Sequence, residues 1–496
     1  MNVTPHLPVL VVIAPLMAAP LAVAFASARL AWWLAFIVSL AAAGMSFELL
    51  ASARAGTVLS YAVGDWPPPW GIELRVDRLN ALVLALVSTM SAVVLPFARA
   101  SVGREVSSDR VYLFYACWML CLCGLLGMTV TGDAFNVFVF LEISSLSTYT
   151  LVSLARRRQA LLAAFRYLIM GTVGATFILI GIVLIYMMTG TLNMADMSER
   201  MQALTHLRPV QAGAVFILVG VALKMALFPM HMWLPGAYYH APMAVTAFLA
   251  ATATKVAVYL MLRFSFTIFG PTLILDDMQL GIPLALLGGA AALVGSLLAL
   301  ANSDVKRILA YSSLAQIGYM ALGIATGMVA AVAGAILHLV NHAIMKSALF
   351  MALGAARNLS PGETTSMSML RGAGRRMPWT MAGFTIAAAS LVGIPFTAGF
   401  LSKWYLIVGT FERGWWPLAA LAIMTSLMAA IYMGRLIEII WMSDPGEQTP
   451  VREAGWLSLV PVLILAAASV YFGVSTDLTA GVAFDAARTV LAEVPK

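Results

Sequence analysis

The chain has very little charge for its length. Only 10% of its 496 residues are Asp, Glu, Lys or Arg, whereas soluble proteins carry about a quarter. Hydrophobic residues make up 62% of the sequence, and its mean hydropathy is +0.93. This composition excludes an ordinary soluble protein and predicts a chain that uses the lipid bilayer as its solvent.

Cysteine is also scarce. The three residues, Cys117, Cys121 and Cys123, lie in one apolar segment without a Cys-x-x-Cys pair. This pattern favours ordinary buried packing over a metal or cluster site. No Rossmann fingerprint, cysteine cluster or quinone signature is visible either. We therefore predict no metal, no cofactor and no redox site in this chain.

Long apolar runs dominate the rest of the sequence. A membrane span needs about 20 apolar residues, and this criterion predicts about fourteen helices. Their approximate ranges are 7–26, 30–51, 78–99, 111–130, 134–155, 165–189, 211–232, 243–264, 280–301, 305–326, 329–356, 378–408, 415–441 and 455–474. Met1–Phe25 lacks a basic start, so we interpret it as a first membrane helix and not a secretory peptide. Ala53–Asp77 is too polar to span, and predicts an interfacial hairpin with its tryptophans at headgroup level.

The basic residues indicate an orientation. The net charge is +7, but the arginines lie in short loops between spans and need no nucleic-acid partner. One side of the predicted topology collects Arg99, Arg104, Arg110, Arg156, Arg157, Arg158, Lys306, Arg307, Arg357, Arg371, Arg375 and Arg376. The other collects mainly Arg54, Arg75, Arg78, Arg200, Arg208, Arg263 and Arg413. By the positive-inside rule the first side is cytoplasmic. An even number of spans then predicts both termini outside the cytoplasm, in a protein of the cell membrane.

Two predicted spans contain helix-breaking residues. The seventh carries Pro229 and Pro235, and the twelfth carries Gly393, Pro395 and Gly399. Proline removes a helix hydrogen bond and clashes with the preceding turn, and the freed carbonyls are tolerated at membrane depth only beside a cavity or protein partners. Paired interruptions in the two halves of a transporter point to inverted repeats and a midplane site. Two kinked structural helices are the alternative.

Five ionisable side chains lie inside predicted spans: Glu142, Lys224, Lys255, Lys346 and Lys403. A charge at the bilayer centre costs about 2.5–3.5 kcal/mol, so we expect these groups to face one another, or water, inside a bundle. Buried lysine changes its protonation readily. The pattern therefore indicates a protein that moves ions.

At these residues the sequence resembles the antiporter-like subunits shared by respiratory complex I, membrane hydrogenases and Mrp-type Na+/H+ antiporters. The resemblance extends over roughly residues 110–440. It rests on the ordered motifs Phe140-Leu-Glu142, Lys224…Pro229-Met-His231-Met-Trp233-Leu-Pro235, Lys255, Asp304-Val-Lys306-Arg307-Ile-Leu-Ala-Tyr311-Ser312-Ser313, His338…His342…Lys346, and Gly393-Ile-Pro395…Gly399-Phe…Lys403.

Two details favour the D-type subunit of Mrp antiporters within this family. The segment Gly236-Ala-Tyr238-Tyr239 follows Pro235, which looks like the Mrp D-type version, and Lys403 stands where one complex I paralogue carries glutamate. A departure from complex I is Gln316, at a position where several of those relatives have histidine.

The resemblance implies an all-α polytopic membrane protein of about fourteen helices, with helices 7 and 12 broken and two inverted five-helix repeats at about 111–264 and 280–441. Residues 1–110 would hold helices 1–3 and the hairpin, 111–440 the antiporter-like core, and 441–496 a C-terminal helix and tail. The implied function is a proton-conducting, non-enzymatic subunit of a hetero-oligomeric antiporter that exchanges H+ for Na+ or another monovalent cation. A proton-pumping membrane subunit of a complex I-like oxidoreductase or hydrogenase remains the alternative.

The resemblance also implies a set of proton-translocating residues: Glu142, Lys224, Lys255, His338, His342, Lys346 and Lys403. Glu142 and Lys224 would form a pair whose separation releases a proton; a static buried salt bridge is the alternative. Lys255 would be a central relay or, alternatively, a lysine snorkelling to an interface. Lys403 would be the terminal station.

His338, His342 and Lys346 recur at i, i+4 and i+8, which places them on one helix face. They suit a proton wire, or the histidines are structural. Further candidate relay groups are His231, Thr252, Thr254, Tyr311, Ser312 and Ser313. His231 is equally a candidate partner for the freed backbone of its broken helix. Lys306 and Arg307 are interpreted as a cytoplasmic anchor.

Overall fold

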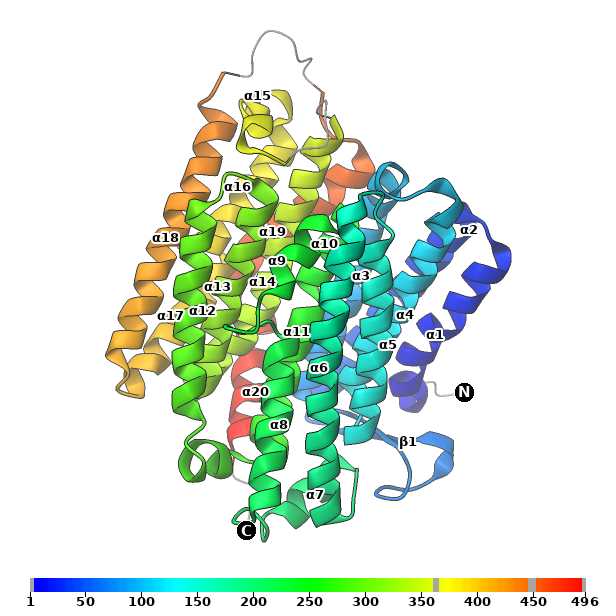
Figure 1. The fold of residues 1–496 in the computed structure, drawn as a ribbon, viewed down its shortest axis with the longest axis vertical. Coiled ribbons are helices and arrows are strands. Elements are labelled where there is room, and N and C mark those ends of the chain that lie inside the picture. The colour runs from blue at the N-terminus through cyan, green and yellow to red at the C-terminus, as the bar shows by residue number, and fades with distance from the viewer. Residues whose placement is uncertain (1–3, 360–364, 445–451, 493–496) are drawn as a thin grey trace.

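Apolar runs of 19 to 32 residues form the long helices of this protein. In lipid each backbone N–H and C=O must find its partner within the segment, and the helix satisfies this requirement. The computed structural model describes residues 4–359, 365–444 and 452–492. Its helices run side by side in one elongated bundle (Figure 1), and the predicted all-α polytopic membrane fold is confirmed.

Within the described residues, twelve helical stretches are long and apolar enough to cross a membrane. They contain α1 (Leu7–Phe25), α2 (Ala28–Arg54), α3 (Arg78–Glu105), α4 (Val111–Val130), α5 (Ala134–Ser153), α6 (Arg158–Thr189), α10 (Met243–Ala251) joined to α11 (Ala253–Leu262), α12 (Gly281–Ala301), α13 (Val305–Thr326), α14 (Val329–Leu359), α18 (Trp416–Trp441) and α19 (Trp456–Val474). The shorter helices are α7 (Met194–Met201), α8 (Arg208–Lys224), α9 (Trp233–His240), α15 (Ala373–Arg376), α16 (Pro378–Val392), α17 (Ala398–Glu412) and α20 (Val482–Leu491).

The two interruptions predicted from proline and glycine are present. Eight residues, 225–232, separate the end of α8 from the start of α9, and Pro229 is one of them. Helix α16 ends at Val392, and α17 begins after a gap that contains Gly393 and Pro395. Gly393 has a φ of +91°, a conformation that glycine adopts without strain. The other two predicted breaking residues, Pro235 and Gly399, lie in the first turns of α9 and α17.

A third interruption was not predicted. Thr252 separates α10 from α11 with φ −123° and ψ −63°, outside the helical region. The N–H groups of Lys255 and Val256 both bond its carbonyl, at 2.9 and 3.0 Å. The predicted span over 243–264 is therefore two helices in line, and the break lies one turn before Lys255.

The stretch between α2 and α3 forms the predicted hairpin. Strands β1 (Leu59–Ala62) and β2 (Glu73–Val76) pair antiparallel, with Leu59 opposite Val76. Trp66 and Trp70 lie between the strands and are 68% and 85% exposed. The hairpin lies at the same end of the bundle as α7 (Figure 1).

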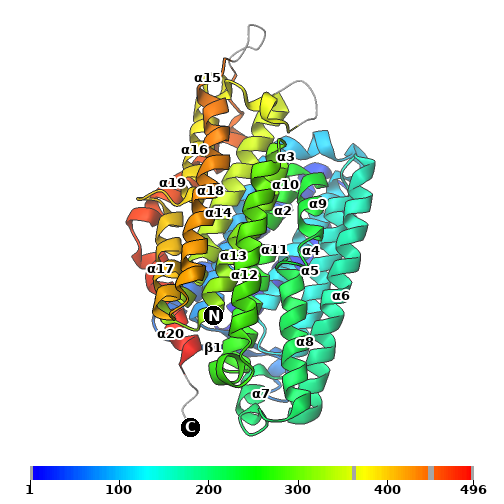
Figure 2. The same ribbon diagram turned by 60° about the vertical axis from the view of Figure 1, so that its left-hand side comes forward.

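The two ends of the bundle differ. Both chain ends lie toward the end that carries α7 and β1, and α15 lies at the opposite end (Figures 1 and 2). At the α15 end, isolated β-bridges join the loop residues Val106 to Ala155 and Asp304 to Ser366. Helices α10, α11, α13 and α14 fill the centre, where nearly every residue is buried. They position the functional groups described next.

Candidate functional site

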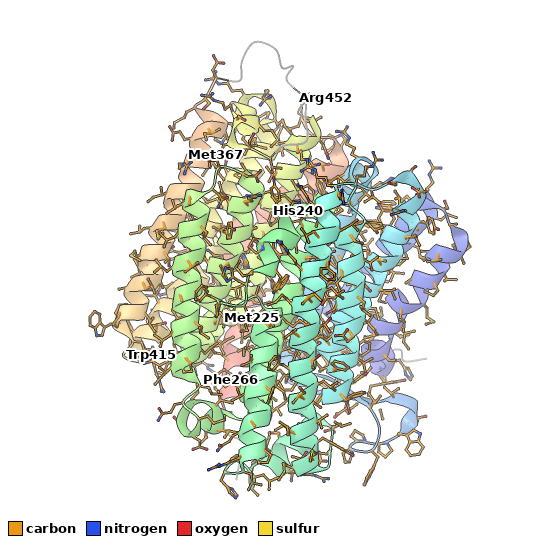
Figure 3. All side chains as sticks on the ribbon, viewed as in Figure 1. Met225, His240, Phe266, Met367, Trp415 and Arg452 are labelled. Atoms are coloured by element: carbon orange, nitrogen blue, oxygen red, sulfur yellow. The ribbon has the colours of Figure 1, made fainter. Side chains whose placement is uncertain are left out.

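The amines that the sequence places inside spans lie inside the protein. Lys255, Lys346 and Lys403 are 1%, 0% and 7% exposed, and the Lys224 side chain is half-buried. Met225, the residue after Lys224, lies near mid-height of the bundle (Figure 3). None of the four reaches the ends of the bundle, because each donates to a group within it.

Lys224 is the last residue of α8, so it stands at the first gap. Its Nζ donates to Ser145 Oγ on α5 at 2.9 Å. Glu142 lies one turn earlier on α5 and is close enough to interact with Lys224 electrostatically. No nitrogen–oxygen distance of 4.0 Å or less joins the two side chains. Glu142 and Lys224 therefore do not form a salt bridge in this structure, which differs from the static buried salt bridge considered as the alternative.

Lys255 lies in the first turn of α11, directly after the Thr252 interruption. Its Nζ donates to the carbonyl of Ala250, which the interruption frees, and to Thr254 Oγ1 at 3.2 Å. Thr252 itself donates its hydroxyl to the Phe248 carbonyl at 2.8 Å. An amine bonded in this way inside the bundle does not snorkel to an interface, so that alternative for Lys255 is wrong.

His338, His342 and Lys346 share one face of α14, as their spacing predicts. The His338 ring is hydrogen-bonded at both nitrogens: Nδ1 to Ser402 Oγ and Nε2 to Gln316 Oε1, each at 2.8 Å. The His342 ring stacks on that of His338 with centroids 5.9 Å apart. Neither nitrogen of His342 has a hydrogen-bond partner among the described residues. A buried imidazole with two vacant positions is a place where water would be held.

Lys346 lies one turn beyond His342 on α14, and Lys255 of α11 lies near His342. Lys346 donates to Ser312 Oγ and to the Leu309 carbonyl, the latter at 2.7 Å. Both lysines are near enough to His342 for electrostatic interaction, and so is His338. The structure therefore brings Lys255, His342, His338 and Lys346 into one buried cluster.

Lys403 continues this cluster at the second predicted gap. Its Nζ donates to the carbonyls of Leu391 and Val392 at 2.8 and 3.0 Å, and to Ser426 Oγ at 2.9 Å. The two carbonyls are at the C-terminus of α16, where helical partners are missing and the partial charge is negative. The ammonium also lies 5.1 Å from the centre of the Tyr319 ring. Lys403 is thus a partner for the broken helix and a neighbour of His338, with which it interacts electrostatically.

The candidate relay residues fall into two groups. Ser312 and Thr254 contact lysines of the cluster directly, and Thr252 shapes the break beside Lys255. Ser313 donates to the Leu309 carbonyl at 3.1 Å. His231 lies in the first gap, 5% exposed, and its ring stacks on Phe228. Tyr311 is half-buried and makes no hydrogen bond to these groups. The structure therefore does not join His231 or Tyr311 to the cluster directly.

Several groups at the site were not expected from the sequence. The hydroxyls of Ser145, Ser402 and Ser426 each bond a titratable side chain. Gln316, which stands where several complex I relatives have histidine, bonds His338. Each of these four is a polar residue in a helix of the membrane-spanning region, and this is the feature by which the sequence could have marked it as a candidate. Within the described residues, no three His, Cys, Asp or Glu side chains are placed to hold a metal ion.

These features define a class: a polytopic membrane protein whose interior carries a row of amines and imidazoles at interrupted helices. The family model described as "NADH:quinone oxidoreductase/Mrp antiporter, TM" matches residues 131–429. This range contains the whole row, from Glu142 to Lys403. The chain belongs to this family.

Named relatives come from both branches of the family. The chain is 39% identical to the N subunit of the NADH-quinone oxidoreductase of Desulforudis audaxviator, over 96% of this chain and 97% of that one. It is 33% identical to the D subunit of the Na+/H+ antiporter of Alkalihalophilus pseudofirmus, over 84% and 83%. A chain in the structure of the Mrp complex from Dietzia sp. DQ12-45-1b superposes with a TM-score of 0.90 and 25% identity, covering 99% of this chain and 98% of that one.

Proposed function

We propose that the chain is the proton-conducting subunit of a multisubunit antiporter that exchanges protons for Na+ or another monovalent cation. The Alkalihalophilus relative is named as part of a Na+/H+ antiporter, and the structural neighbour belongs to an Mrp complex. Its partners would be the other membrane subunits of such a complex, in the cell membrane. The observation that carries the proposal is the buried row of titratable groups that ends at interrupted helices.

The proton route that we propose begins at Glu142 and Lys224. Held apart as they are here, the carboxylate stabilises the ammonium only weakly, because Coulomb energy falls with distance. A movement of α5 against α8 that brought them together would favour the charged lysine, and the reverse movement would favour release of its proton. The pair would act as a switch at one end of the row.

The next step runs through Lys255, His342, His338 and Lys346. Like charges repel, so protonation of Lys255 disfavours a proton on Lys346 and the reverse. A proton arriving at one side of the cluster would therefore promote release at the other. The two open nitrogens of His342 would let water and imidazole carry the proton between the lysines. Lys403 would be the last buried station, exchanging its proton with the bulk phase or a neighbouring subunit.

The arrangement of the chain ends supports the proposed orientation. Both ends lie away from α15, and the arginine-rich loops gather at the α15 end. By the positive-inside rule that end would be cytoplasmic and both termini would lie outside. The proposed division is 1–110 for the first three membrane helices and hairpin, 111–440 for the conducting core with its two inverted repeats, and 441–496 for the C-terminal helix and tail.

A transport assay tests the proposal. The chain would be expressed with its partner subunits in a host that lacks other Na+/H+ antiporters, and Na+-driven dissipation of a pH gradient measured in inverted vesicles. Lys255→Ala should assemble normally and abolish the exchange, and Arg110→Gln, an exposed loop residue outside the row, should leave it unchanged. Exchange by Lys255→Ala at the wild-type rate would refute the route.

One observation favours the second candidate, a proton-pumping subunit of an oxidoreductase complex. The relative with 39% identity is a subunit of an NADH-quinone oxidoreductase. The same buried row would then conduct protons driven by electron transfer in another subunit. Identification of the co-purifying subunits decides between the two, because only an oxidoreductase assembly would contain cluster-bearing partners.

A further inference from the structure

A polar cavity lies at the α15 end of the bundle, apart from the buried row of titratable groups. Its wall includes residues of the α3–α4 and α5–α6 loops and of the junction between α9 and α10. His240, one of its lining residues, lies toward that end of the bundle (Figure 3). The centres of water-sized atoms can occupy about 30 Å3 of the cavity, which is more than one water requires.

The cavity wall carries much more positive than negative charge. Five basic side chains line it, Arg104, Arg156, Arg157, Lys306 and Arg357, against Glu105 as the single carboxylate among the described lining residues. Both oxygens of Glu105 are already engaged, one by Arg357 and the other by the Met243 backbone N–H at 2.7 Å. One carboxylate thus offsets one guanidinium, and four cationic side chains remain among the described lining residues.

Three of these four cations, Arg104, Arg156 and Lys306, bond backbone carbonyls in the part of the chain that the structure describes. Arg104 donates to the Asn358 carbonyl, and Arg156 to the Val106 carbonyl at 3.2 Å. Lys306 donates to the Ala241 carbonyl at 2.7 Å. A carbonyl satisfies a donor but does not neutralise a charge, so positive charge predominates among the described lining residues.

Of the three, Lys306 has the greatest need of a counter-ion, because its side chain is only 3% exposed. Its amine lies inside the protein and not in water, and the interpretation of Lys306 and Arg307 as a cytoplasmic anchor stays a prediction. Glu105 and Asp304 are within electrostatic range of the amine, but no described carboxylate lies within 4.0 Å of it. An ammonium buried without a counter-ion is costly. His240 adds a buried Nδ1 atom without a partner among the described residues.

Three helices also begin at this cavity. Its lining includes the residue that precedes α6, the residue that precedes α10, and the second residue of α13. A helix N-terminus carries a partial positive charge, which favours an anion, although the Met243 N–H of α10 already bonds Glu105 and the Arg307 N–H of α13 already bonds Asp304. The backbone therefore adds to the field of the side chains.

We propose that this cavity binds a phosphate group. A phosphate oxygen would give the Lys306 ammonium the counter-charge it lacks, and the guanidinium groups of Arg104 and Arg156 would form charge-assisted bonds to the others. The group is the headgroup phosphate of an anionic phospholipid or free inorganic phosphate. Basic pockets between helices at the cytoplasmic side of a bundle are suited to such headgroups. The proposal goes beyond proton transport and is tested without it.

The experiment measures binding to the complete complex, with its partner subunits, in nanodiscs of phosphatidylcholine. One arm titrates phosphatidylglycerol into the nanodiscs and counts the molecules that the complex retains, by native mass spectrometry. The other arm measures equilibrium binding of radiolabelled inorganic phosphate. Arg156→Gln at the rim and Lys306→Met in the wall remove one charge each. Arg110→Gln is the matched control, an exposed arginine at the same end that does not line the cavity.

The wild-type complex is expected to retain phosphatidylglycerol over phosphatidylcholine, and Arg156→Gln to weaken this binding about tenfold. Arg110→Gln should bind as the wild type. Competition by inorganic phosphate would assign the site to the phosphate group itself, and lipid binding without competition would assign it to the lipid. If Lys306→Met does not fold, the comparison of lipid and phosphate binding between Arg156→Gln and the wild type still tests the proposal. Equal binding by wild type and Arg156→Gln, or retention of neither probe, would overturn the proposal and leave a water-filled cavity.

Discussion

Gln316 Oε1 lies 2.8 Å from Nε2 of His338, and this bond joins α13 to the face of α14 that carries the buried histidines. The other ring nitrogen of His338 bonds Ser402 on α17 at 2.8 Å. His338 is therefore oriented from two sides, whereas neither nitrogen of its neighbour His342 has a hydrogen-bond partner among the described residues. Hydrogen bonds thus hold the His338 ring in one orientation but not the His342 ring. A fixed imidazole beside one that can rotate would suit proton transfer in one direction.

Replacement of Gln316 should impair exchange through its effect on the His338 ring. Gln316→Met keeps the volume but removes the acceptor, which leaves a buried imidazole nitrogen without a partner at a cost of about 1–3 kcal/mol. We expect exchange to slow by about tenfold and the thermal stability of the purified complex to fall. Gln316→His restores a polar partner and should keep most of the exchange. Wild-type exchange by Gln316→Met would show that the ring needs no such partner.

The separation of Glu142 from Lys224 leads to a second prediction. Glu142→Ala or Lys224→Ala should assemble normally and lose exchange, because each removes one member of the proposed switch. Ser145→Ala removes only the hydroxyl that Lys224 contacts here, so a partial loss is expected. The measurement is Na+-driven proton movement in vesicles with equal amounts of each variant. Arg166→Gln, on the exposed face of α6, serves as the control.

Two of the three helix interruptions could be predicted from the sequence, because their causes are local. Proline lacks an N–H wherever it lies, and Gly393 adopts a φ of +91° without strain. Thr252 carries no such signal, since threonine is compatible with a helix. Its conformation depends on what packs around it, including the Lys255 amine that takes up the freed Ala250 carbonyl.

The members of the buried row could be found from the sequence, but their partners could not. A lysine or histidine in an apolar segment stands out by its chemistry alone. The pairing of His338 with Gln316 or Ser402 joins residues 22 and 64 positions apart, and no local pattern specifies such contacts. The burial of the Lys306 amine could not be predicted for the same reason, because it depends on α9 packing beside the start of α13.

Lys403 allows a test of whether its amine transfers protons or only satisfies carbonyls. Lys403→Met removes the donor to the Leu391 and Val392 carbonyls, so we expect lost exchange and a stability loss of about 1–3 kcal/mol. Lys403→Glu supplies a titratable group that can donate one bond when protonated, and should retain partial exchange. Both variants are compared by exchange rate and by thermal unfolding. If Lys403→Met exchanged as fast as the wild type, Lys403 would be a structural partner only.

At the opposite end from α15, the Asp77–Arg263 pair predicts a pH-dependent stability. Burial raises the pKa of the Asp77 carboxyl, but the bidentate contact with Arg263, at 2.6 and 3.0 Å, and the N–H groups of Leu79 and Asn80 outweigh it. The pKa of Asp77 is therefore held below its ordinary value of 3.8.

A lowered carboxyl pKa contributes stability that is complete above the ordinary value and is lost as the pH falls through the folded value. Asp77→Asn should thus destabilise the protein by about 3–5 kcal/mol at pH 7, because Arg263 is left buried and unpaired. The difference from wild type should shrink only below about pH 4. Thermal unfolding of both proteins between pH 3 and pH 7 measures it. A constant difference over that range would contradict the lowered pKa.

The packing of α17 against α16 limits what can replace Gly399. A Cβ atom at this position would overlap the Ser390 carbonyl oxygen, so an alanine would push the two helices apart. Overpacking of this kind costs about 1–3 kcal/mol, and the shift would reach Lys403, one turn further along α17. Gly399→Ala should lower both stability and exchange. Gly434→Ala is the matched control, because a Cβ there meets nothing within 4 Å and alanine favours a helix. If both variants behaved like the wild type, close contact between α16 and α17 would not be what holds Lys403 against the broken end of α16.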